Sequence, residues 1–122
     1  MSESINFKDG ELCCQGEFCC GGYNGATQEL LNSLENLRRL GGDNPIVLSS
    51  VYRCPQHNAN VGSKHTSFHS KGLACDVVEI GKWDAWTKEG AEAIQNLMEQ
   101  NGMWTYIGKG FVHGDLRDRQ KR

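Results

Sequence analysis

The sequence predicts a small α+β domain in which two helices pack against an antiparallel sheet. Leucines recur at helical spacing after Thr27, and a second stretch with a helical apolar pattern runs from Thr87 to Gln100. Short runs rich in β-branched and aromatic residues, bounded by glycine or proline, indicate strands between and after the helices. The 122 residues suffice for one modest core, so we expect a single domain over 1–122.

Both expected helices have recognisable ends. Thr27 can cap the first helix and Gly41 can end it, while Gly102 follows the end of the second. The apolar positions repeat every three or four residues, so one side of each helix is expected in the core. The core positions are Leu30, Leu31, Leu34 and Leu37 in the first helix, and Ala91, Ile94, Leu97 and Met98 in the second.

Strands are expected at 46–52 and 73–80, followed by a hairpin formed by 103–107 and 111–116. The alternation of side chains in 73–80 puts Asp76 on a face that is otherwise apolar. A carboxylate there must be paired, hydrogen-bonded or bound to a metal, because burying it alone costs several kcal/mol. The residues expected on this face are Ala74, Asp76, Val78 and Ile80.

Charge and hydropathy exclude several classes of function. The formal net charge of −2 argues against a general nucleic-acid binder, and no apolar run approaches the length of a membrane span. Residues 1–5 show neither the basic nor the apolar region of a secretory signal, so we expect synthesis in the cytoplasm and release by another route. Residues 117–122 are expected to form a solvated basic tail, and we expect a monomer.

The N-terminal residues 1–25 are irregular and rich in cysteine. Three states are open for these thiols: reduced and packed in a loop, bound to a second, structural metal ion, or joined in disulfides. Disulfides are not the default without a secretory signal, and adjacent cysteines differ from the C-x2-C pairs of ordinary zinc ribbons. The residues concerned are Cys13, Cys14, Cys19 and Cys20.

Two histidines and an aspartate match the ligands of a catalytic zinc ion. His69 lies shortly before Asp76, and His113 lies in the last expected strand. Three protein ligands leave a fourth position for water, whereas a structural zinc site usually has a fourth protein ligand. Asp115 lies two residues after His113 and therefore shares its face of the strand. The segment 53–72 lacks apolar periodicity and holds three of the four histidines, which favours a functional loop.

Three spaced blocks surround these residues: Ser50-x-Tyr52-Arg53-Cys54-Pro55-x-x-Asn58-x-x-Val61-Gly62, Ser67-x-His69-x-x-Gly72-x-Ala74-x-Asp76 and Phe111-Val112-His113-x-Asp115-x-Arg117. The blocks resemble the M15 peptidases, which are zinc D-Ala-D-Ala carboxypeptidases and endopeptidases that cut bacterial cell-wall peptides. Several phage lysins are among them. The likeness extends from about residue 7 to 117 and is greatest to a small branch whose members often open with a Cys-rich segment.

The resemblance implies a fold like that of the DD-peptidases and hedgehog domains, with zinc in a cleft on the sheet. It implies that His69, Asp76 and His113 hold the zinc ion. It also assigns Arg53 and Ser67 to substrate binding, and the planar guanidinium of an arginine suits a carboxylate. The implied substrate is the stem peptide of peptidoglycan, reached after release from the cell or as part of a phage particle.

One position departs from the family pattern. Many M15 enzymes carry a catalytic Glu three residues before the last histidine ligand, where this chain has Gly110. Two roles are open for Asp115: it is the catalytic base, or it hydrogen-bonds His113 and orients it. Gly114 is smaller than expected and predicts extra room beside the metal. The alternative function is a zinc-containing module that binds the cell wall or builds a virion with little or no catalysis.

Overall fold

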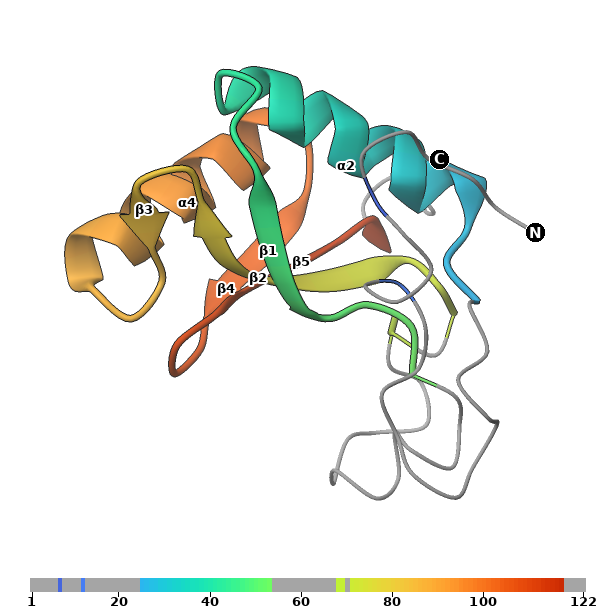
Figure 1. The fold of residues 1–122 in the computed structure, drawn as a ribbon. Coiled ribbons are helices and arrows are strands. Elements are labelled where there is room, and N and C mark those ends of the chain that lie inside the picture. Colours follow the sequence, from blue (N-terminus) through green and yellow to red (C-terminus); the bar gives the residue numbers. More distant parts are fainter. Residues whose placement is uncertain (1–6, 8–11, 13–24, 54–67, 70, 118–122) are drawn as a thin grey trace.

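Two helices and an antiparallel sheet form the part of the chain that the structure describes (Figure 1). The computed structural model describes residues 7, 12, 25–53, 68–69 and 71–117. The predicted α+β fold is confirmed. In chain order the elements are α2 (Gln28–Leu40), β1 (Ile46–Ser50), β2 (Ala74–Ile80), β3 (Trp83–Asp84), α4 (Lys88–Gln100), β4 (Trp104–Ile107) and β5 (Val112–Asp115).

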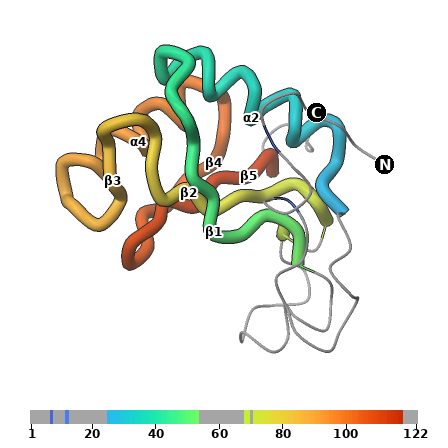
Figure 2. The backbone as a smooth tube through the Cα atoms, viewed as in Figure 1, coloured from blue at the N-terminus to red at the C-terminus, as the bar shows by residue number. Residues whose placement is uncertain are grey.

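The strand order of the sheet is β1-β2-β5-β4, and the short strand β3 pairs with β2. Every pair is antiparallel. The β4–β5 hairpin, orange to red in Figure 2, therefore lies beside β2 although α4 separates them in sequence. Strand β3 was not predicted, because two residues are too short to show an alternating pattern.

The predicted helix ends are largely confirmed. The Thr27 hydroxyl accepts a hydrogen bond from the backbone N–H of Leu30 at 3.1 Å, and the Thr87 hydroxyl caps α4 in the same way. Gly41 follows α2, and Asn101 caps the end of α4 with Gly102 just past it, at φ of +79°. The Asn101 amide also donates to the backbone carbonyl of Ser33 in α2 at 2.9 Å, so this cap joins the two helices.

The sheet has two chemically different faces. Directly opposed residues of antiparallel strands point to the same side, so Asp76 and His113, which are paired across β2 and β5, share what we call the site face. Cys75 and Gly114 are paired on the opposite side, the core face, where α4 packs and Gly114 lies against Met98. The site face contains the rows Asp76, His113 and Tyr106, and Ala74, Asp115 and Trp104.

The predicted alternation along β2 is wrong at its end. The pairing of β1 with β2 passes from Val47↔Glu79 to Leu48↔Val77, so Val78 is an extra residue on β2. Such a bulge reverses the side to which the following residues point. Ile80 consequently joins Val77 in the hydrophobic core instead of sharing the face of Asp76.

The expectation for Gly114 is also wrong. A methyl group at this position would overlap the end of the Met98 side chain, on the face of β5 that lies away from His113. The lack of a side chain therefore lets α4 approach the sheet and leaves no room beside the metal ligands.

Several predictions fall outside the described residues: the cysteine pairs at 13–14 and 19–20, Ser67, and the tail beyond residue 117. Among the described helices, none is long and apolar enough to cross a membrane.

Candidate metal centre

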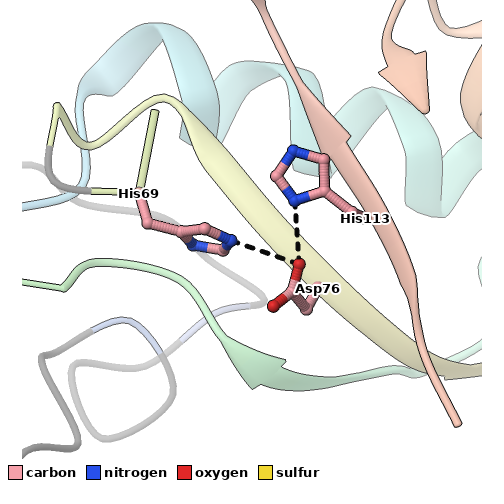
Figure 3. Close-up of side chains that lie close together, drawn as sticks. All are labelled: His69, Asp76 and His113. Atoms are coloured by element: carbon pink, nitrogen blue, oxygen red, sulfur yellow. Dashed lines mark hydrogen bonds and ion pairs between the residues drawn. The ribbon is translucent and has the colours of Figure 1, made fainter. Parts of the chain in front are cut away.

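The three predicted ligands come together from separate elements. His69 lies in the turn that precedes β2, Asp76 lies within β2, and His113 lies on β5 directly opposite Asp76. All three side chains are buried. Figure 3 shows both imidazole rings directed at the carboxylate of Asp76.

Both histidines contact the same carboxylate oxygen. Oδ1 of Asp76 is 3.2 Å from Nε2 of His69 and 3.0 Å from Nδ1 of His113 (Figure 3). One ligand atom from each of the three residues lies within 4.8 Å of the others. Zinc bonds of about 2.1 Å in a tetrahedron place neighbouring ligand atoms about 3.4 Å apart, and the separations of 3.0 and 3.2 Å between Asp76 and the two histidines are close to this value.

The outer nitrogens of both histidines already have hydrogen-bond acceptors. Nδ1 of His69 is 2.7 Å from the backbone carbonyl of Val51, and Nε2 of His113 is 2.7 Å from Oδ2 of Asp115. A carbonyl and an ionised carboxylate only accept hydrogen bonds, so each outer nitrogen carries the proton. In the neutral imidazoles the inner nitrogens then present lone pairs to the Asp76 carboxylate. Two lone pairs facing a carboxylate require a proton or a metal cation between them, and this is how metal-binding histidines are oriented.

The protonation of the site is coupled. Burial by itself raises the pKa of Asp76, but hydrogen bonds from His113 and His69 outweigh it and lower that pKa to about 2. Burial by itself lowers the pKa of His113, but hydrogen bonds to Asp115 and Asp76 outweigh it and raise the pKa above its ordinary value. The raised pKa of His113 favours its protonated form beside the Asp76 carboxylate, and a metal ion bound between them would displace that proton.

Asp115 is fully buried and has four hydrogen bonds. Oδ2 accepts from His113 and from Nη2 of Arg117, and Oδ1 accepts from Nε and the backbone N–H of Arg117. A carboxylate has about four lone-pair positions, so this one is saturated. Burial raises the pKa of Asp115, but the bonds from His113 and Arg117 outweigh it and lower that pKa to about 2.

Comparison with known proteins identifies the family. The family model for peptidase M15 matches residues 5–115. This chain belongs to the peptidase M15 family. The resemblance of the sequence blocks is thereby confirmed.

Among solved structures, the Serratia marcescens L-Ala D-Glu endopeptidase ChiX matches 80% of this chain and 86% of its own, with 17% sequence identity and a TM-score of 0.50. At this identity the likeness concerns the fold alone. No curated protein sequence matches the chain.

The position of the Glu found in many M15 peptidases has a backbone conformation and a neighbour that disfavour a side chain here. Gly110 has φ of +83°, which favours glycine, and a Cβ atom at this position would overlap the indole ring of Trp86. Replacement of Gly110 by Glu would therefore require both a change of backbone conformation and displacement of Trp86.

Arg53, assigned to substrate binding by the family resemblance, lies close to the site. Its backbone N–H donates to the carbonyl of His69 at 3.2 Å. Its charge also acts on Tyr106: burial and the Asp76 carboxylate raise the pKa of the Tyr106 phenol, and Arg53 opposes this rise. Arg53 therefore lies near the candidate metal centre, at the end of the segment that begins with β1.

Sequence reasoning missed the surroundings of His113. The half-exposed ring of Tyr106 stacks on the imidazole at a centroid distance of 4.7 Å, and Trp104 lies edge-on to it at 6.2 Å. Arg117, expected to begin the solvated tail, bonds to Asp115 instead. Its place in the third sequence block was the available signal, whereas no pattern indicated Tyr106.

Proposed function

We propose that this M15 peptidase is a zinc-dependent hydrolase that cuts an amide bond in the stem peptide of bacterial peptidoglycan. The observation that carries the proposal is the orientation of the two histidines. Both outer nitrogens are occupied by acceptors, and both inner nitrogens face Asp76.

In this proposal His69, Asp76 and His113 hold the zinc ion. Zinc in such a site supplies Lewis acidity, which activates water and polarises a carbonyl group. Arg53 binds a substrate carboxylate or the oxygen of the scissile carbonyl, since a guanidinium keeps its charge at every working pH. Ser67 contributes a hydroxyl to the same substrate.

For Asp115, the hydrogen bonds favour the orienting role over the role of catalytic base. A base must present a lone pair to the attacking water, and the four bonds of Asp115 leave none. In the orienting role Asp115 keeps the proton of His113 on Nε2, so Nδ1 remains directed at Asp76.

Two kinds of peptide bond are candidates for cleavage. An endopeptidase cuts within the stem peptide, as the name of ChiX describes for that protein, and a carboxypeptidase removes the terminal D-Ala. We propose L-Ala–D-Glu and D-Ala–D-Ala peptides as the first substrates. The protein would reach the wall after release from the cell or as part of a phage particle.

The test is peptide release from purified peptidoglycan, with the protein as isolated, after treatment with a chelator, and after addition of zinc. We expect new amino groups that disappear with the chelator and return with zinc, and mass spectrometry of the fragments names the bond. Release that is insensitive to the chelator would contradict zinc dependence. Absence of zinc from the protein would contradict the whole proposal.

Asp115→Ala separates its two roles. Loss of zinc affinity together with turnover supports the orienting role. Loss of turnover with unchanged zinc affinity supports the catalytic base.

The second candidate is a zinc-containing module that binds the wall or builds a virion without turnover. It is favoured by Gly110 and by the saturation of Asp115, because these leave the described part of the site without an available carboxylate base. Zinc binding with peptidoglycan affinity but no release from several wall types would support this function.

A further inference from the structure

Arg117 contributes three of the four hydrogen bonds that Asp115 accepts. Its Nε lies 2.9 Å from Oδ1 and its Nη2 lies 2.7 Å from Oδ2, which is the two-pronged arrangement of an arginine with a carboxylate. Its backbone N–H adds a third bond to Oδ1 at 3.0 Å. The carboxylate plane is thereby fixed, with Oδ2 directed at Nε2 of His113.

Two aromatic rings hold the guanidinium in place. The central carbon of the Arg117 guanidinium lies 3.6 Å from the centroid of Trp104 on β4 and 5.0 Å from that of Phe68. Stacking on rings suits the planar guanidinium and is not available to an ammonium group in the same form. Phe68 directly precedes His69, so Arg117 contacts the loop of one candidate ligand and, through Asp115, the side chain of the other.

We propose that Arg117 is a positioning residue for the metal centre. It acts through Asp115, which keeps the Nε2 proton and the ring orientation of His113, and its contacts with Trp104 and Phe68 hold the guanidinium in place for this role. Arg117 does not itself touch the metal or the substrate in this role. The proposal rests on the zinc site proposed above, and it predicts metal affinity rather than only turnover.

The expected effect follows from the place of Arg117 behind Asp115, which hydrogen-bonds the candidate ligand His113. Loss of a hydrogen-bond partner behind a metal ligand lowers metal affinity by roughly 10–100-fold. Arg117→Ala should fall in this range. Arg117→Lys should fall between Arg117→Ala and the natural protein, because it keeps the charge but loses the second prong and the planar stack.

The first measurement is zinc affinity of the metal-free full chain, by competition with a chromogenic chelator. Arg38→Ala is the matched control. Arg38 lies in the last turn of α2 and also pairs with an aspartate, Asp43, at 3.9 Å, but this pair is not part of the candidate site. We expect this control to bind zinc as the natural protein does. If Arg117→Ala does not fold, Arg117→Lys carries the same test.

The second measurement asks whether Arg117 acts through Asp115. Zinc affinity is compared among Arg117→Ala, Asp115→Ala and the double variant. The proposal expects the double variant to bind zinc about as well as Asp115→Ala alone, because the Arg117 contribution requires the carboxylate. Losses that multiply would overturn the proposed route through Asp115.

Three outcomes are distinct. Failure of the natural protein to bind zinc removes the proposed function. Zinc binding that is normal in both Arg117 variants overturns the positioning role alone. Normal zinc affinity with weakened peptide release would instead make Arg117 a substrate-binding residue.

Discussion

The two faces of β2 and β5 are made by alternate residues of the same strands, yet they have opposite chemistry. On the core face Cys75 and Val77 are fully buried among apolar side chains of the helices. On the site face Asp76 and His113 are also buried, but each hydrogen-bonds to other ionisable groups. Burial is therefore not what distinguishes the faces.

The difference shows what each face needs from its neighbours. The core face requires close packing of apolar side chains, so a change there should alter the free energy of unfolding. The site face needs hydrogen-bond partners and charges in particular places, so a change there should alter metal affinity and the pH dependence of stability. Cys75 illustrates the contrast, since burial, together with the charges of Asp76 and Asp115, strongly raises the pKa of its thiol.

The largest effect is expected for Asp76→Ala on the site face. Zinc sites in proteins bind with about 10–16 kcal/mol shared among their ligands, so loss of one ligand should weaken zinc binding roughly 10³-fold and abolish peptide release. The measurement is zinc competition with a chelator. Glu79→Gln on the same strand is the control, and equal losses in the two variants would contradict the assignment of Asp76.

Met98→Ala tests the core face. Met98 in α4 is fully buried and lies against Gly114, so its truncation should lower the free energy of unfolding by about 2–5 kcal/mol. Zinc affinity of the folded protein should stay unchanged. Urea unfolding and zinc competition measure the two quantities. Glu99→Ala, at the exposed neighbouring position, is the control, and a loss of zinc affinity in Met98→Ala would mean that the faces are coupled.

The pH dependence of stability should come from the site face. In the metal-free protein the pKa of Asp76 and that of Asp115 are lowered to about 2. Their stabilisation is therefore complete above the unfolded value of about 3.9, and it is lost as the pH falls toward 2, with a size on the order of 2 kcal/mol for each carboxylate. The raised pKa of His113 acts oppositely: its stabilisation is present below about 6.5 and is lost as the pH rises through the raised value.

Urea unfolding of chelator-treated protein across this pH range measures the loss of stability at acid pH (the acid arm) and the loss as the pH rises through the pKa of His113. Asp76→Asn should flatten the acid arm, because the variant has no carboxylate to protonate at that position. An acid arm as steep as that of the natural protein would show that other groups carry it.

The smallest effect is expected for Gly114→Ala. The added methyl group would overlap the flexible end of Met98 and lie 3.1 Å from the end of Met103, so we expect a loss of about 1 kcal/mol in the free energy of unfolding and no change in zinc affinity. The loss should shrink in the Met98→Ala background. Altered zinc affinity would restore the original prediction that Gly114 borders the metal.

The helices and most of the strands could be predicted because their signals are local. The spacing of Leu30, Leu34 and Leu37 and the hydroxyl of Thr27 act within one or two turns of the same helix. The candidate ligands could likewise be recognised in the sequence. Two histidines and an aspartate at this spacing suggest a metal site more readily than another function.

The tertiary structure decided how those residues are used. The choice of inner nitrogen depends on the carbonyl of Val51 for His69 and on Asp115 for His113, and the first of these acceptors lies on a separate segment. The saturation of Asp115 depends on how Arg117 folds back on it. The side to which Ile80 points depends on an extra residue in the pairing with β1.

Sequence by itself thus determined which chemical groups the protein has and which local elements carry them. Strand register and contacts between distant segments decided which lone pairs meet, because a shift of one residue turns a side chain to the opposite face.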